Sequence, residues 1–150
     1  MSNTADISPA IVETLYGEAL DLADAARAAF DQRRLGDHGE EARIALSSET
    51  LRTTTRMMHA LAWLLNQRAF FRGELSEFAL RRHGRLPPPQ PETRPDQLRL
   101  LDYDLQVLVA RTSAFYARIG RLDEAWRKHF AMEPTAVERL RMRIGERMGA

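Results

Sequence analysis

The stretch from Leu98 to Trp126 places apolar or small side chains at strictly alternating steps of three and four residues. Its members are Leu98, Leu101, Leu105, Leu108, Thr112, Phe115, Ile119, Leu122 and Trp126. This spacing is that of a coiled-coil seam, and it predicts one long helix from about residue 96 to residue 130. Asp96 suits the positive amino-terminal end of such a helix, and Lys128 suits its negative carboxyl-terminal end. A seam of this length is typical of a helix bundle.

Two further long helices precede this one. Ser8 followed by Pro9 predicts a helix start, because serine caps free backbone N–H groups and proline is tolerated at the first helical position. That helix extends to about Leu35 and carries the stripe Val12, Leu15, Ala19, Leu22, Ala26 and Ala29. The second helix begins between Asp37 and Ser48, which are rival starting points, and continues to about Arg72.

The remaining segments are short. A bend at Gly73 and a short helix ending near Gly84 are expected after the second long helix. Residues 84–95 are rich in proline and predict a stiff connection, which is favoured over a ligand for an SH3-type domain. No alternating strand pattern stands out. The sequence therefore predicts an all-α fold, an antiparallel three-helix bundle over residues 1–131 followed by a tail over residues 132–150.

The second helix carries two apolar faces. The first is expected to face the core and comprises Leu51, Thr54, Met58, Leu61 and Leu65, widened by Met57 and Leu64. The opposite face comprises Arg52, Arg56, His59, Trp63, Gln67 and Phe70. Each of its two large rings is worth roughly 1.5–3 kcal/mol when buried, so something should cover this face. The mixture of aromatic rings and arginine favours a homodimer or partner interface over internal cover by the segment from Leu75 to Arg82.

The tail carries a second candidate surface. Its thin apolar stripe and adjoining arginine are expected to dock on a partner or on the bundle, and the pattern leaves both open: Val137, Leu140, Arg141, Ile144 and Met148. Pro134 should separate the tail from the bundle. A helix this short is marginal alone in water, so the tail is expected to be more mobile than the bundle.

Composition excludes several classes of function. The chain has no cysteine, so it forms no disulfide and no thiolate metal site, which fits a reducing cytoplasm. A net charge of +1 provides no overall field for nucleic acid, and the longest apolar run, from Ala60 to Leu65, is far too short to span a bilayer. With no targeting segment at its amino terminus, the protein is expected to be soluble and cytoplasmic.

Catalytic and ligand-binding patterns are missing from the sequence. The four histidines, His38, His59, His83 and His129, are scattered and none has a metal-ligand partner at helical spacing. There is no glycine-rich phosphate loop and no nucleophile elbow. The sequence therefore predicts no catalytic residue, no metal, no cofactor and no enzymatic activity.

The block from Ser48 to Ser76 carries a distinctive set of residues. They are Glu49, Leu51, Arg52, Thr54, Thr55, Arg56, Met58, Ala62, Trp63, Leu64, Leu65, Gln67, Arg68, Ala69, Gly73 and Glu74. This set resembles the central helix of the RcdA-type family, the alphaproteobacterial regulators of CtrA degradation that act as adaptors of the ClpXP protease. The RLD sequence from Arg121 to Asp123 also fits, whereas Thr53, His59 and Asn66 depart from the pattern.

The resemblance implies a non-catalytic homodimeric adaptor that joins ClpXP, a priming response regulator and protein cargo during the cell cycle, with its carboxyl-terminal tail as a mobile contact. The alternative is a helical scaffold that binds another protein or nucleic acid without a role in proteolysis. An unrecognised enzyme built on a helix bundle is the third possibility.

Overall fold

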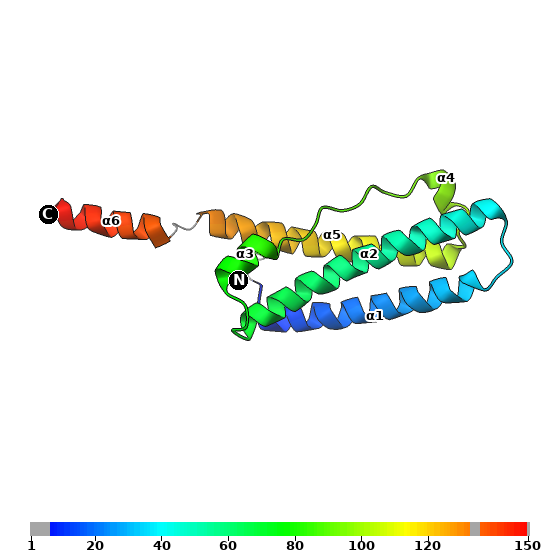
Figure 1. Cartoon of the computed structure of the whole chain (residues 1–150), viewed down its shortest axis with the longest axis horizontal. Coiled ribbons are helices and arrows are strands. Elements are labelled where there is room, and N and C mark those ends of the chain that lie inside the picture. The colour runs from blue at the N-terminus through cyan, green and yellow to red at the C-terminus, as the bar shows by residue number, and fades with distance from the viewer. Residues whose placement is uncertain (1–6, 133–135, 150) are drawn as a thin grey trace.

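The computed structural model describes residues 7–132 and 136–149, and in these ranges it contains helices and no strand (Figure 1). Three long helices form the bundle: α1 (Pro9–Arg34), α2 (Glu40–Phe71) and α5 (Tyr103–Met132). Three shorter helices complete the chain: α3 (Glu77–His83), α4 (Pro95–Leu98) and α6 (Ala136–Met148). The predicted all-α bundle of three long helices, with a short helix after the second, is confirmed.

The helix boundaries follow local chemistry. Ser8 caps α1 by accepting a hydrogen bond from the backbone N–H of Ile11 at 3.2 Å, and Pro9 opens the helix, as predicted. The start of α2 is settled in favour of the earlier position, directly after Gly39. Gly84 ends α3 in a tight approach, because a Cβ at this position would lie only 2.6 Å from the carbonyl oxygen of Leu80.

The three long helices do not simply alternate in direction. Arg68 near the end of α2 pairs with Glu13 near the start of α1 at 2.7 Å, and Arg33 near the end of α1 pairs with Asp102, directly before α5, at 2.6 Å. Both pairs join a late position to an early one, so α1 is antiparallel to α2 and to α5. The helices α2 and α5 are therefore parallel to each other, as Figure 1 also shows.

Parallel neighbours require a connection that returns along the bundle, and residues 84–94, called the arm below, provide it (Figure 1). The arm is packed down along its length. Leu86 is buried in the core, the hydroxyl of Tyr116 donates a hydrogen bond to the carbonyl oxygen of Pro87, and Arg52 donates one to that of Pro91 at 2.8 Å. The proline-rich segment is therefore held against α2 and α5 by these contacts.

The predicted helix over residues 96–130 is interrupted near its start. Residues 99–102 are not helical. A new helix, α5, begins at Tyr103, where the carboxylate of Asp102 accepts a hydrogen bond from the backbone N–H of Leu105 at 3.0 Å. Arg33 of α1 binds the same carboxylate at 2.6 Å. These two donors, Arg33 first, hold the pKa of Asp102 below its usual range.

Within α5 the predicted seam is confirmed. Its members from Leu105 to Ile119 are buried, and so is Trp126. The stripe of α1 is likewise buried from Val12 to Ala26 and is extended by Phe30. Two adjoining apolar clusters result, one in the half of the bundle around Trp63 and Ile119 and the other around Phe30 and Leu105.

The core face of α2 agrees with the prediction only in part: Met57 and Leu64 are buried as expected, and Leu61 is partly buried against the core. Leu51, Met58 and Leu65, expected in the core, are 69%, 63% and 47% exposed. The buried face instead consists of Ala45, Leu46, Glu49, Thr53, Met57, Ala60, Trp63, Leu64 and Gln67. The reason is that α1 and α5 together cover the side of α2 that carries Trp63, which leaves the longer aliphatic stripe outside.

Candidate partner-binding surfaces

The described residues contain neither a cluster of metal ligands nor a membrane-spanning helix. Over residues 7–132 and 136–149, no three potential metal ligands of the His, Cys, Asp or Glu type gather in one place. Among the described helices none has both the length and the apolarity needed to cross a bilayer.

The face of α2 predicted as the dimer interface is covered from within the chain. Trp63 and Gln67 are 2% and 1% exposed, so the prediction that this face forms the centre of a homodimer is wrong. Arg52, Arg56 and His59 are half-buried, the first two beneath the arm. Phe70 is half-buried as well and packs against Phe71, with 5.3 Å between the centroids of the two rings.

Asp123 explains why Trp63 points inward. Its buried carboxylate accepts the indole N–H of Trp63 at 3.0 Å and the backbone N–H of Leu86 at 3.3 Å. It also forms an ion pair with Arg127 at 3.2 Å. One carboxylate therefore ties α2 and the arm to α5. The sequence showed the RLD triplet from Arg121 to Asp123 but gave no sign of this role, because its partners lie far away along the chain.

The outer face of α2 carries an unusual apolar row, called the α2 seam below. Four large side chains recur every seven residues along it: Ile44, Leu51, Met58 and Leu65. Each is followed four residues later by a smaller side chain: Ser48, Thr55, Ala62 and Ala69. All four large side chains are exposed, with Ile44 at 55%. Single exposed apolar residues are ordinary, but a continuous row at coiled-coil spacing is typical of a contact surface.

The predicted tail surface lies on α6. Its four apolar members, Val137, Leu140, Ile144 and Met148, are 50–83% exposed, and Arg141 is exposed as well. Docking of this stripe on a partner or on the bundle stays a prediction. The predicted break at Pro134 lies outside the described residues.

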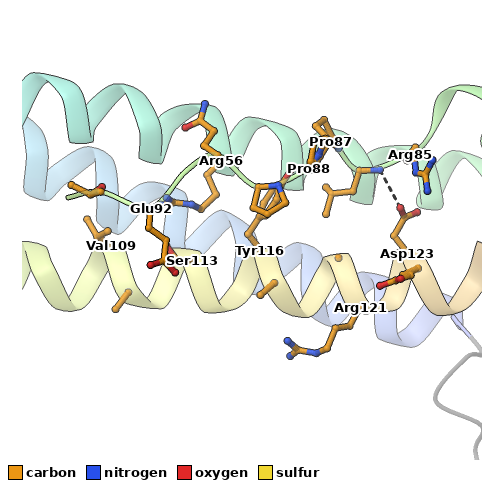
Figure 2. A pocket seen from close by; sticks show the side chains of 18 of the residues that line it. Arg56, Arg85, Pro87, Pro88, Glu92, Val109, Ser113, Tyr116, Arg121 and Asp123 are labelled. Carbon is orange, nitrogen blue, oxygen red and sulfur yellow. Dashed lines mark hydrogen bonds between the residues drawn. The ribbon is translucent and has the colours of Figure 1, made fainter. Parts of the chain in front are cut away.

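A groove runs between the arm and α5, with a volume of about 1050 Å³ (Figure 2). Its walls are formed by the prolines of the arm and by small side chains of α5, such as Ala110, Ser113 and Ala117. Gln106 and Glu124 lie near its two ends. At a rise of about 1.5 Å per residue, the groove extends for about 27 Å along α5. The sequence does not predict this groove, because the proline pattern shows that the arm is stiff but not where it lies.

Arg56 is the central charged group of this groove. It descends from α2 toward α5 and donates a hydrogen bond to the hydroxyl of Thr112 at 2.9 Å (Figure 2). Of the carboxylates in the described part of the chain, none lies within ion-pair distance of it. Burial lowers the pKa of Arg56, and the more distant charge of Glu49 offsets part of that effect.

The other charges along the groove are divided unevenly. Arg85 and Arg121 line it without an ion pair to any described residue, and Arg121 points away from the arm at the rim (Figure 2). Two of the acidic lining residues already form ion pairs: Asp123 with Arg127, and Glu124 with Lys128 at 3.6 Å. Glu92 is the remaining acidic side chain. Uncompensated positive charge therefore dominates the groove.

Comparison with known proteins gives one match. No curated protein and no solved structure matches the chain significantly. A family model described as a protein of unknown function, DUF1465, matches residues 3–148. Because this match takes in nearly the whole sequence, the chain belongs to the DUF1465 family.

Proposed function

We propose that this protein is a non-catalytic adaptor that binds regulatory proteins and helps deliver them to the ClpXP protease during the cell cycle. The link to ClpXP comes from the resemblance of residues 48–76 to the RcdA-type family. The link to protein binding comes from the shape and chemistry of the surface. A priming response regulator and protein cargo are the expected partners.

One observation carries this proposal, namely the exposure of the α2 seam. Leu51, Met58 and Leu65 belong to the set of residues that resembles the adaptor family, yet none of them is needed to close the core. Their burial against another protein would gain roughly 25 cal/mol for each Å² of apolar surface removed from water. A role in association accounts for their presence on an outer helix face.

The proposed homodimer uses the same seam. Large and small side chains alternate along it, so two antiparallel copies of α2 can set the large side chains of one chain against the small ones of the other. Such an interface is self-complementary, as twofold symmetry requires. It replaces the interface that was predicted around Trp63.

A helical scaffold without a role in proteolysis is the second candidate. The observation that favours it is the basic polar face of α6, where Arg139, Arg141, Arg143 and Arg147 are exposed and could meet nucleic acid or an acidic protein surface. The apolar stripe of the same helix suits a protein partner equally well.

An affinity pull-down from the extract of a related bacterium separates the two candidates. The adaptor predicts specific enrichment of ClpX, ClpP and a response regulator by the intact chain. A matched bait that ends at Met132 lacks α6 and should capture less of at least one of them. Enrichment of RNA polymerase or nucleic acid with no protease subunit would contradict the adaptor and favour the scaffold.

A further inference from the structure

The walls of the groove beneath the arm are fixed by specific contacts. Its arm wall is held by the hydrogen bonds of Pro87 and Pro91 described above, and its floor contains Arg56, which descends from another helix. Four of the eleven arm residues are prolines, which have no N–H to donate, so the arm cannot form a continuous ladder of hydrogen bonds with an incoming strand. Apolar contact and the charged side chains are therefore the main means of recognising a ligand.

Length and charge identify the class of ligand. A groove of about 27 Å fits about eight residues of extended peptide, which rise about 3.3 Å each. Arg56 and Arg85 oppose the single unpaired carboxylate of Glu92, while Arg121 adds positive charge at the rim. A half-buried guanidinium is well suited to a carboxylate, which it can bind through two parallel hydrogen bonds.

The chain's own tail is a poor occupant. The helix α6 carries four arginines against two glutamates, a formal charge of +2, so it would bring positive charge to a positive groove. The occupant should come from another protein and should be acidic.

We propose that this groove binds an extended acidic peptide segment of a partner protein, with a carboxylate of that segment on Arg56. The apolar side chains of the segment lie against the arm prolines and the small residues of α5. This site deepens the proposed function and rests on it, because it makes the chain a binding module that reads an acidic segment.

The test uses the full chain and a fluorescein-labelled peptide of about eight residues with alternating glutamate and leucine. Fluorescence anisotropy should show saturable binding. A peptide with glutamine in place of each glutamate should bind at least about tenfold more weakly, because it offers no charge to Arg56.

Variants locate the site. Arg56→Gln should weaken binding of the glutamate peptide by at least about tenfold, and the more exposed Arg85→Gln by about two- to fivefold. Glu92→Gln should strengthen binding by about two- to fivefold, because it removes a like charge. Arg111→Gln is the matched control, since Arg111 is exposed on α5 outside the groove and its loss changes the net charge equally.

The outcomes are distinct. Equal binding of the two peptides, equal weakening by Arg111→Gln and Arg56→Gln, or no binding at millimolar peptide would overturn the proposal. If Arg56→Gln does not fold by circular dichroism, Arg85→Gln and Glu92→Gln decide through their opposite directions. The assay contains no protease, so its failure leaves the adaptor role to be judged by degradation.

Discussion

Replacing Asp123 by alanine is expected to lower the free energy of unfolding by about 3–5 kcal/mol, the usual cost of removing one partner from a buried ion pair. Its carboxylate is the acceptor for the indole N–H of Trp63 and the backbone N–H of Leu86, and it pairs with Arg127. Without it, these donors are left in a region that excludes water, and each buried unpaired donor costs about 1–3 kcal/mol. Urea denaturation followed by circular dichroism measures the change.

Glu124→Ala is the matched control for this experiment. Glu124 follows Asp123 directly, but it is exposed, and its one ion pair among the described residues is with the exposed Lys128 at 3.6 Å, so its loss should cost less than about 1 kcal/mol. If Asp123→Ala costs no more than Glu124→Ala, the proposed link from α2 and the arm to α5 is wrong.

Placing two glutamates on the α2 seam, as Leu51→Glu with Met58→Glu, is expected to convert the proposed homodimer to monomer. Both side chains are more than half exposed within one chain, so the bundle should keep its helical content. In the dimer, each glutamate would have to leave water without a partner, which is costly for an ionised group. Light scattering at micromolar concentration should show the mass fall to the 17.1 kDa of a single chain.

Leu20→Glu provides the control for that result. Leu20 is 41% exposed on α1, away from the α2 seam, so a charge there should leave the dimer intact. A wild-type protein that is already monomeric at this concentration would contradict the homodimer. A double variant that keeps the dimer mass would place the interface elsewhere.

Regular single-sided patterns made α1 and α5 predictable from sequence. In both helices the most regular apolar stripe lies on one face, and the structure buries that face, as at Leu15 and Ile119. The helix cap at Ser8 and the helix end at Gly84 were also predictable, because both depend on residues that are close together in the sequence. The break before Tyr103 was not, since Asp102 gains its second partner from Arg33 of another helix.

The faces of α2 could not be ranked by periodicity because both are apolar. The more regular stripe is that of Leu51, Met58 and Leu65. The other face is nevertheless the buried one, because the indole N–H of Trp63 has a buried hydrogen-bond acceptor in Asp123, which is distant in the sequence. Buried polar side chains such as Glu49 also lie on the true core face, and hydropathy counts against them.

The candidate sites were only partly predictable. The stripe of α6 is predicted as a docking surface from its sequence pattern, and its occupant stays a prediction. The groove depends on α2 and α5 being parallel, which makes the arm return along the bundle. Composition showed that the segment is stiff but not where it lies, so Arg56 was assigned to an interface instead of to a groove.

The rate of cargo degradation in a reconstituted mixture tests the adaptor role most directly. The mixture contains ClpXP, the priming response regulator and a candidate regulatory protein as cargo, with or without this chain. The account predicts faster loss of cargo with the intact chain and a smaller gain with the chain that ends at Met132, while the chain alone leaves the cargo intact. If no cargo is degraded faster in any combination and no component binds the chain at micromolar concentration, the adaptor role is contradicted.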